Sequence, residues 1–163
     1  MKEKTKSNKF IFLYIFLVLF ILLVASRFFV PKIIELIDNR FIIVNGNSMA
    51  PTLNDGDKIL YKKTDSFKRF DIIVFKNDSN TLIKRIYGLP GETIIINNGK
   101  IYINSTELID DNYAYNYTDG DNNITLGDNQ YFVLGDNREI SLDSRHFGPI
   151  EKNSIKGIVI LDK

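Results

Sequence analysis

Ser48, Lys84 and His146 are the residues whose types and surroundings could support hydrolytic chemistry. A serine hydroxyl is a poor nucleophile at neutral pH, so it needs a base beside it, and that base is usually a histidine. His146 is the only histidine of the 163-residue chain. The chain has no cysteine, which excludes a cysteine nucleophile, a cysteine-based metal site and a disulfide framework. Three interpretations remain open: His146 is the base, another residue is the base, or the chain is no hydrolase.

Lys84 is the second candidate for the base, because it lies in a stretch with the alternation of a β-strand, TLIKRIY at 81–87. Side chains alternate between faces along a strand, so Leu82, Lys84 and Ile86 would share one face. Apolar neighbours desolvate a lysine and lower its pKa, and a neutral amine can accept a proton from serine. An isolated strand lysine is more often a solvated charge, so this pattern alone does not identify the base.

Two polar segments could supply the remaining groups. Ser48 lies in NGNSMAPTLNDGD at 45–57, where Gly46 permits an unusual backbone conformation and Pro51 stiffens the exit. Residues 135–150, GDNREISLDSRHFGPI, are rich in potential hydrogen-bond partners. Neither segment identifies a reaction by itself.

The first element that must position these groups is a membrane anchor. Residues 10–26 form an uncharged apolar stretch, and with a snorkelling Arg27 the run extends over 21 residues, 10–30. At about 1.5 Å per residue, a helix of this length crosses roughly 30 Å of hydrocarbon. A cleaved secretory signal also has a basic start and an apolar core, but this run is long for a signal and lacks a small-x-small exit. We therefore predict a transmembrane helix at 10–30.

The distribution of charge predicts which end of the membrane anchor faces the cytoplasm. Four lysines and one glutamate leave residues 1–9 with a net charge of +3, so the rest of the chain carries −2 of the total of +1. Only Arg27 and Lys32 closely follow the span. The positive-inside rule then places residues 1–9 in the cytoplasm and everything after residue 30 outside it, as in a single-pass type II protein of the cell membrane. The slightly acidic remainder gives no reason to expect nucleic-acid binding.

A mainly β domain is predicted for residues 41–163, after a membrane-proximal linker at 31–40. Short β-branched and aromatic runs alternate there with turn residues, and no helical periodicity follows residue 40. Asn98-Gly99, between two of the runs, is a strong signal for a two-residue hairpin. The pattern indicates small antiparallel sheets. The predicted strands lie at 41–44, 58–61, 71–75, 81–87, 93–97, 100–104, 130–134 and 155–161.

The segment at 107–128 differs from the rest of the body. It contains six acidic residues and no lysine or arginine, so we predict a solvated insertion. Its DGDNN at 119–123 resembles the start of a calcium loop. The sixth position is Ile124 instead of glycine and the twelfth is Gln130 instead of glutamate, so we predict no EF-hand and no metal site.

Taken together, and in this order after an N-terminal anchor, four motifs resemble type I signal peptidases, the Ser/Lys-dyad leader peptidases of peptidase family S26. The resemblance covers about residues 1–150. It implies an all-β catalytic domain with a variable insertion, here at about 92–130. The motifs are Ser48-Met49-x-Pro51-Thr52-Leu53, Gly56-Asp57, Lys84-Arg85-x-x-Gly88-x-Pro90-Gly91, and Gly135-Asp136-Asn137 with Ser141-x-Asp143-Ser144-Arg145-x-x-Gly148.

The resemblance implies an endopeptidase that removes signal peptides from secreted preproteins, cleaving after small residues in Ala-x-Ala-like sequences. Ser48 would be the nucleophile, with its backbone N–H in the oxyanion hole, and Lys84 the general base. Ser141 would hydrogen-bond the lysine amine. The supporting ion pairs would be Asp143 with Arg145 and Asp136 with Arg85. The shallow apolar S1 and S3 pockets would be lined by Val44, Met49, Leu53, Leu82 and Ile83.

The resemblance also bears on the alternatives. Some family members place a serine two residues before the nucleophile to complete the oxyanion hole, where this chain has Gly46. The eukaryotic branch replaces the base with histidine, so Lys84 indicates the bacterial branch, and the single span and short insertion resemble Gram-positive members. His146 is then interpreted as a loop residue. The expected partners are signal peptides and the lipid bilayer, with no cofactor and a monomeric enzyme.

Three competing functions were weighed against the same residues. Self-cleaving repressors share a Ser/Lys dyad and a related β core but are soluble, which the anchor excludes. Penicillin-interacting enzymes need Ser-x-x-Lys, whereas Ser48 is followed by Met49-Ala50-Pro51. A catalytically inactive, membrane-anchored binding module would be indicated by loss of Ser48 or Lys84, and both are present.

Overall fold

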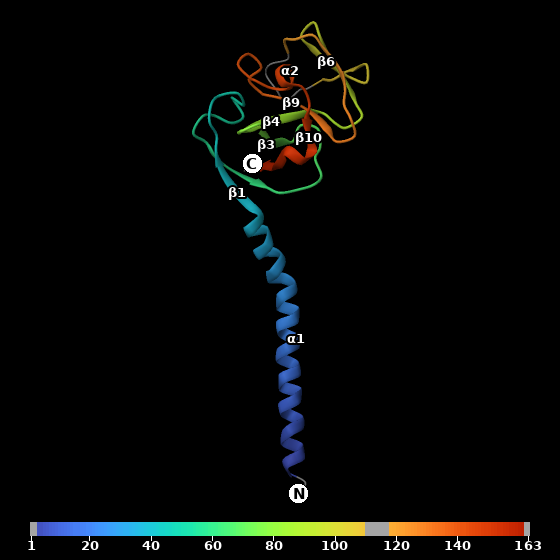
Figure 1. Ribbon diagram of the computed structural model, residues 1–163. Coiled ribbons are helices and arrows are strands. Elements are labelled where there is room, and N and C mark those ends of the chain that lie inside the picture. The colour runs from blue at the N-terminus through green and yellow to red at the C-terminus, as the bar shows by residue number, and fades with distance from the viewer. Residues whose placement is uncertain (1–2, 110–117, 162–163) are drawn as a thin grey trace. The chain divides into compact units, whose positions relative to one another are not determined.

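The structure is a computed structural model that describes residues 3–109 and 118–161, with the backbone alone at 3–9, 32 and 34–39. The chain divides into two units, Met1–Asn39 and Arg40–Lys163, which are described separately. Figure 1 shows the helix of the first unit and the strands of the second.

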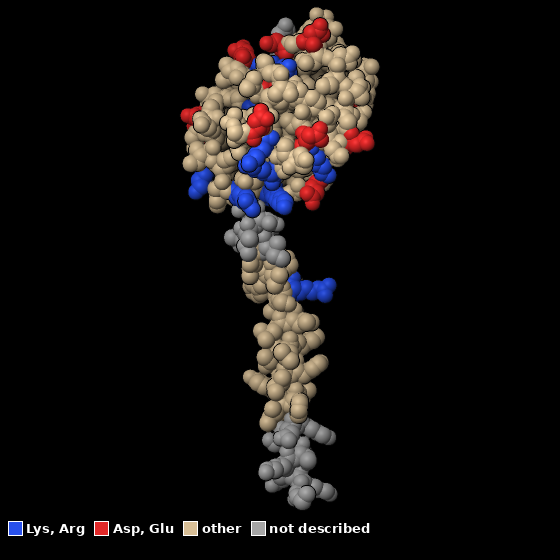
Figure 2. All heavy atoms as spheres, in the orientation of Figure 1, with Lys and Arg blue, Asp and Glu red and all other residues tan. Residues whose placement is uncertain are grey.

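The first unit consists of one helix, α1 (Glu3–Asp38). Its segment Phe10–Pro31 has a mean hydropathy of 2.6 and is long and apolar enough to cross a membrane, by length and composition. Arg27 is the only charged residue of that segment, whose surface is otherwise uncharged (Figure 2). The helix continues through the predicted linker at 31–40 to Asp38. Pro31 lacks a backbone N–H and removes one hydrogen bond, but it does not end the helix.

The second unit contains a seven-stranded sheet. The strand pairs with a defined register, from β2 to β10, are all antiparallel. The C-terminal strand lies between β2 and β3, so the sheet is complete only when this last segment of the chain has been inserted. In spatial order the strands are β1 (Asn39–Ile43), β2 (Lys58–Lys62), β11 (Ile155–Ile160), β3 (Ile72–Asn77), β4 (Asn80–Gly88), β9 (Gln130–Leu134) and β10 (Ile150–Glu151).

A smaller sheet of four strands lies wholly within the predicted insertion at 92–130. Its order is β7 (Thr106–Glu107), β6 (Lys100–Ile103), β5 (Thr93–Asn97) and β8 (Asn122–Thr125). The turn between β5 and β6 is formed by Asn98 (φ 50°) and Gly99 (φ 79°), which confirms the predicted hairpin. The chain is therefore mainly β and antiparallel, as predicted, and each of the eight predicted strands is present.

The prediction of a solvated segment at 107–128 agrees with the exposure of most residues in 118–128, but it is wrong for two buried side chains there and did not foresee a strand. β8 pairs with β5, and Ile124 lies opposite Ile94. Thr118 and Leu126 are only 1% and 2% exposed. Pairing with a neighbouring strand and burial against the core thus override an acidic, Asn-rich local sequence. Residues 110–117 of the predicted segment lie outside the described residues.

Three apolar clusters form the core of the second unit. β3 contributes to two of them, because its successive side chains point to opposite faces. The Met49 cluster contains Val44, Met49, Leu53, Ile59, Tyr61, Ile72, Val74 and Ile83. The Phe75 cluster contains Ile73, Phe75, Ile86, Tyr131, Val133 and Ile150. The Phe132 cluster, which joins the two sheets, contains Tyr87, Ile94, Ile96, Ile101, Leu126, Phe132 and Leu134.

β4 contributes to all three clusters and is buried on both faces from Ile83 to Gly88. Gly88 leaves no room for a side chain, since a Cβ there would be 2.7 Å from Cδ1 of both Ile94 and Leu126. The C-terminal region adds two short helices, α2 (Ser144–Phe147) and the 3₁₀ helix η1 (Lys152–Ser154). Lys84 therefore lies on a strand that is buried on both faces at this position.

Candidate active site

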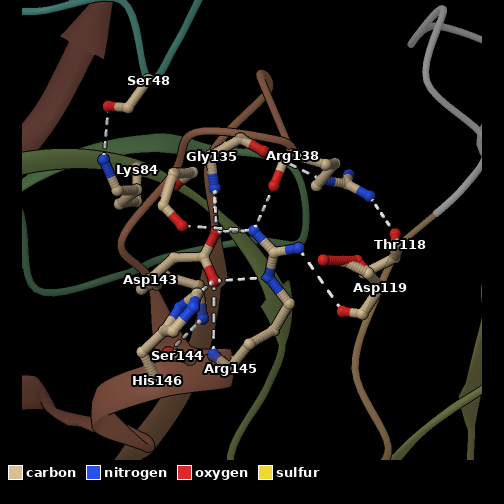
Figure 3. Close-up of polar contacts among 12 residues, drawn as sticks. Ser48, Lys84, Thr118, Asp119, Gly135, Arg138, Asp143, Ser144, Arg145 and His146 are labelled. Carbon is tan, nitrogen blue, oxygen red and sulfur yellow. Dashed lines mark hydrogen bonds and ion pairs between the residues drawn. The ribbon is translucent and has the colours of Figure 1, made fainter.

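Ser48 and Lys84 come together although 36 residues separate them. Lys84 Nζ lies 2.6 Å from Ser48 Oγ (Figure 3). Lys84 is 3% exposed, and Ser48 is half-buried in the turns that follow β1. At this distance a charged lysine donates a hydrogen bond to the serine oxygen, and a neutral amine can accept one from the serine hydroxyl.

Burial lowers the pKa of Lys84 from 10.5 to about 8, while the charges of Asp143 and Asp136 act in the opposite direction. The desolvating neighbours are those that the alternation predicts. Lys84 pairs across the strands with the fully buried Ile73, and Ile86 on β4 belongs to the same Phe75 cluster. Desolvation outweighs the two carboxylates, so neutral amine is available within reach of ordinary pH.

His146, the other candidate for the base, does not contact Ser48. Its side chain is 54% exposed on α2, and its nearest charged partner is Asp143, at 4.0 Å from Nδ1. Among the described residues it makes no hydrogen bond to a serine. The structure thus brings Lys84, and not His146, to Ser48.

The loop that carries Ser48 is held at both ends. Val44 N–H donates to the Asp57 carbonyl at 2.8 Å, and Gly56 N–H donates to the Val44 carbonyl at 2.9 Å. Within the loop, Gly46 N–H donates to Asp55 Oδ1 at 2.7 Å. The φ of Gly46 is 88°, a conformation that glycine adopts readily and other residues rarely.

These contacts bear on the oxyanion hole. The amide of Gly46 is already used by Asp55, so it is not free to act as the second donor. The Ser48 N–H, in contrast, donates to no other group within the described part of the chain. One backbone donor is thus free at Ser48 among the described residues.

Both predicted ion pairs are formed, and both are buried. Arg85 Nε and Nη2 donate to the two carboxylate oxygens of Asp136 at 2.8 and 2.6 Å. Arg145 Nε and Nη2 donate to the two oxygens of Asp143 at 2.8 and 2.9 Å. Asp143 also accepts from Gly135 N–H at 3.0 Å and precedes the first turn of α2 (Figure 3). These pairs fix the backbone around the dyad.

The predicted hydrogen bond between Ser141 and the Lys84 amine is not formed. Ser141 is 3% exposed, and among the described residues its Oγ has no hydrogen-bond partner. Its position is nevertheless tightly determined. A Cβ on Gly135 would lie 2.1 Å from Ser141 Oγ and 2.5 Å from the Ser48 carbonyl oxygen, so only glycine fits between these two serines.

A cavity of about 70 Å³ opens beside the dyad. Four of the five predicted pocket residues line it together with Ser48 and Lys84, namely Val44, Met49, Leu82 and Ile83. The prediction for Leu53 is wrong in this respect, because Leu53 packs inside the Met49 cluster and does not reach the cavity wall. A cavity this small, with apolar side chains on part of its wall, suits a small aliphatic side chain.

Arg138 and Thr118 lie next to the site and were not predicted. Arg138 is 6% exposed, and its Nε donates to the Gly135 carbonyl at 2.8 Å. Its Nη1 donates to Thr118 Oγ1, and its guanidinium lies 4.7 Å from the ring centroid of Tyr87. The place of Arg138 between Asp136 and Ser141 could have singled it out, but no sequence signal indicated Thr118.

Other parts of the described chain lack comparable chemistry. A larger cavity of about 510 Å³ lies at the ends of β2 and β9, lined by Lys63, Phe67 and Lys152 among others, and contains none of the predicted site residues. The described residues hold no group of three or more histidine, aspartate or glutamate side chains placed to bind a metal.

Known proteins resemble this chain over most of its length. The profile of the family described as "Signal peptidase, peptidase S26" matches residues 8–161. Signal peptidase I V of Bacillus subtilis is 37% identical over 137 residues, which cover 71% of this chain and 80% of that protein. Signal peptidase IB of Staphylococcus aureus is 32% identical over 159 residues, covering 80% and 82%. A crystal structure of a signal peptidase I from Enterococcus faecalis is 36% identical, with a TM-score of 0.51, and covers 58% of this chain and 97% of that one.

Proposed function

The chain belongs to the signal peptidase family, peptidase S26, and from that premise we propose that it removes signal peptides from secreted preproteins through a Ser48/Lys84 dyad. It is a serine peptidase, and thus a hydrolase. The observation that carries the proposal is the 2.6 Å contact between Lys84 Nζ and Ser48 Oγ, made by a lysine whose burial lowers its pKa to about 8. At pH 7 a pKa of 8 leaves about a tenth of the amine neutral, against roughly one part in three thousand for a pKa of 10.5.

The dyad acts in two stages. Ser48 Oγ attacks the scissile carbonyl carbon while the neutral amine of Lys84 takes the hydroxyl proton. The free Ser48 N–H donates to the oxygen that becomes negative. Lys84 then returns its proton to the departing amine, which leaves an ester on Ser48. In the second stage Lys84 takes a proton from water while the water attacks the ester carbonyl, and it passes this proton to Ser48 Oγ as the bond to the acyl group breaks, which regenerates Ser48.

Specificity for small residues follows from the cavity beside the dyad. Its walls include the branched side chains of Val44 and Ile83, both under 9% exposed and packed in the Met49 cluster, so they have little freedom to retreat. A larger substrate side chain would have to displace this core. The proposal is therefore cleavage after Ala-x-Ala-like sequences.

The proposal includes the position of the enzyme in the membrane. Phe10–Pro31 would span the bilayer with residues 1–9 in the cytoplasm and the peptidase domain outside. Signal peptides are themselves apolar, so enzyme and substrate would meet at the same bilayer. One chain provides both dyad residues, which supports action as a monomer. The single span and short insertion support a Gram-positive origin.

The test is cleavage of a preprotein with an Ala-x-Ala site by the full-length chain in detergent, with the new N-terminus determined by mass spectrometry. The wild type should cut directly after the second alanine of the site. Ser48→Ala and Lys84→Ala should each abolish cleavage, and the double variant should be no worse, because members of a dyad act as a unit. Ser66→Ala and Lys76→Ala, at exposed residues of the same types, serve as controls and should stay active.

Two outcomes would reject the proposal. Cleavage by Ser48→Ala would show that another residue is the nucleophile. Binding of the preprotein by the wild type without any cleavage would favour the inactive binding module instead.

A further inference from the structure

A residue in the middle of the predicted insertion, Thr118, contacts the loop that carries Ser141, in a way that the dyad chemistry does not use. Thr118 is 1% exposed, and its N–H donates to the Gly99 carbonyl at 2.8 Å, in the turn between β5 and β6. Its hydroxyl accepts a hydrogen bond from Arg138 Nη1 (Figure 3). Thr118 therefore joins the smaller sheet to residues 135–145, which we call the catalytic loop.

Arg138 depends on this hydroxyl. Its guanidinium is buried over the Tyr87 ring, with one hydrogen bond to the Gly135 carbonyl and one to Thr118 Oγ1. Within the described residues no carboxylate lies at ion-pair distance from it. A buried charged donor that loses an acceptor is strongly destabilised in that position, so removal of the Thr118 hydroxyl should displace the guanidinium.

Displacement of Arg138 would reach the dyad through Gly135. Arg138 Nε holds the Gly135 carbonyl, and Gly135 packs against Ser141 Oγ and the Ser48 carbonyl with no room for a methyl group. Asn137 N–H also donates to the Ser48 carbonyl, at 3.1 Å. A shift of this part of the catalytic loop therefore moves the nucleophile as well.

A second contact runs in parallel. Arg145 Nη1 donates to the Asp119 carbonyl at 3.4 Å, and Arg145 Nη2 donates to the Arg138 carbonyl at 2.7 Å. The residue after Thr118 thus touches the guanidinium that pairs with Asp143. The two contacts connect the smaller sheet to both ends of the catalytic loop.

We propose that Thr118 is a positioning residue for the peptidase reaction, whose hydroxyl fixes Arg138 and thereby holds Gly135 against Ser48 and Ser141. The inference rests on the proposed function and extends it, because it assigns a catalytic consequence to a sheet that contributes no dyad residue. Interactions that hold reacting groups in place affect kcat, whereas the apolar pocket belongs to the separate Met49 cluster and governs substrate binding.

The kinetic test uses three variants of the full chain and a peptide that spans an Ala-x-Ala site. Thr118→Val keeps the shape but removes the hydroxyl, and kcat should fall about tenfold to a hundredfold with little change in KM. Thr118→Ser restores the hydroxyl and should act like the wild type. Thr125→Val is the control, because it removes an exposed hydroxyl of the same sheet that pairs with Thr93 at 2.9 Å, far from any contact with the catalytic loop.

Amide hydrogen exchange gives a readout that needs no activity. Thr118→Val should accelerate exchange in residues 135–145 and leave β3 and β4 unchanged, and Thr118→Ser should not. Unchanged kcat and exchange in Thr118→Val overturn the proposal, as does exchange accelerated equally throughout the domain. If Thr118→Val does not fold, Thr118→Ala gives the same readouts without steric stress. A wild type that cuts no signal peptide rejects the proposed function, while the exchange result still decides the role of Thr118.

Discussion

Lys84 occupies a position in which burial favours the chemistry and opposes the stability of the fold. The amine must be neutral to accept a proton, and desolvation among Ile73 and Ile86 makes it so. The same desolvation makes the charged form unfavourable in the folded state. The two effects can be measured separately, because one appears in rates and the other in unfolding.

The rate should report the titration of Lys84. As pH rises through about 8, the folded-state pKa, the amine loses its proton and kcat/KM should increase until the limb levels off. Lys84→Arg should be inactive, because a guanidinium stays protonated. A pH–rate profile on a signal-peptide substrate measures both. His146→Ala is the control and should keep the limb; its loss in that variant would make His146 the base.

Unfolding should report the cost of burial. Below about pH 8 Lys84 is charged in both the folded and unfolded states, and its full cost is present. Between pH 8 and 10.5 the unfolded state binds more protons, so the free energy of unfolding rises with pH. The lowering of the pKa of Lys84 from 10.5 to about 8 corresponds to a cost on the order of 3 kcal/mol.

Replacement of the amine should remove this cost. Lys84→Met should have a higher Tm than the wild type at pH 7, with the advantage shrinking towards pH 10.5. Thermal unfolding of both proteins in detergent at several pH values tests this. Lys76→Met, at an exposed lysine of β3, should change Tm little at any pH. A lower Tm for Lys84→Met at pH 7 would show that the buried amine is net stabilising.

Ser141 presents the opposite case, a buried hydroxyl without a partner in the described structure. Ser141→Ala removes no hydrogen bond of the folded state, so Tm should be unchanged or slightly higher. We expect kcat nevertheless to fall on the order of 10²-fold, because Ser141 packs directly against the backbone beside Ser48. Differential scanning calorimetry and steady-state kinetics on one preparation measure the two quantities. Full activity would remove Ser141 from the site.

The sequence predicted the residues of the site better than their contacts. Motif resemblance named Ser48, Lys84 and both ion pairs, and the structure brings each of these pairs together. It did not predict that Ser141 Oγ has no hydrogen-bond partner among the described residues, because one hydrogen bond depends on side-chain geometry that a motif does not encode. Thr118 was missed for a related reason: its burial arises from contacts with Gly99 and Arg138, which are distant in sequence.

At the scale of elements, β4 organises the domain. It lies between β3 and β9, is buried on both faces, and carries Lys84 and Arg85 on successive positions. Alternation correctly predicted which neighbours share a face with Lys84, but it could not show that the other face is buried too. That face is covered by the Met49 and Phe132 clusters, whose members come from five other strands and from loops.

The local sequence pattern likewise predicted the longer strands. It missed the short strands, and the strand that forms only because a neighbouring strand pairs with it. β7 and β10 have two residues each, too few for any period to appear. β8 has the sequence NNIT, which is a poor strand former, and it exists because β5 offers a partner edge. Helix α1 passes Pro31 against the expectation of a boundary there.

The close approach of the two sheets at Gly88 gives a prediction at this scale. A methyl group there would lie 2.7–2.8 Å from Ile94, Leu126 and Phe132, so Gly88→Ala must push the sheets apart. We expect a loss of about 1–3 kcal/mol in the free energy of unfolding, measured by urea titration. Gly127→Ala, whose nearest contact would be Gln130 at 3.4 Å, is the matched control and should be tolerated. Equal stability of the two variants would contradict the packing described here.

At the scale of the whole molecule, the distribution of charge predicts the orientation of the chain in the membrane. A reporter enzyme that is active only outside the cytoplasm, fused after Lys163, should be active in intact cells. The physical reason is the charge of +3 on residues 1–9, which keeps that end on the cytoplasmic side. Replacing the four lysines by glutamine should lower reporter activity. An inactive fusion, together with activity of a second fusion whose reporter works only in the cytoplasm, would reverse the topology and exclude secreted preproteins as substrates.

The junction between the two units has a consequence for what the enzyme can reach. α1 ends at Asp38 and β1 begins at Asn39, so no linker separates helix and strand. Seven helical residues lead from Pro31, where the apolar segment ends, to Asp38 and add about 10 Å. Ten more residues lead to Ser48, and a fully extended chain of that length spans at most about 35 Å. For a chain anchored as we propose, the length of this segment limits how far the nucleophile can lie from the bilayer. The nucleophile can therefore reach substrates only in a thin layer beside the membrane. Sequences with two small residues are common in folded proteins, and distance alone would protect most of them from cleavage.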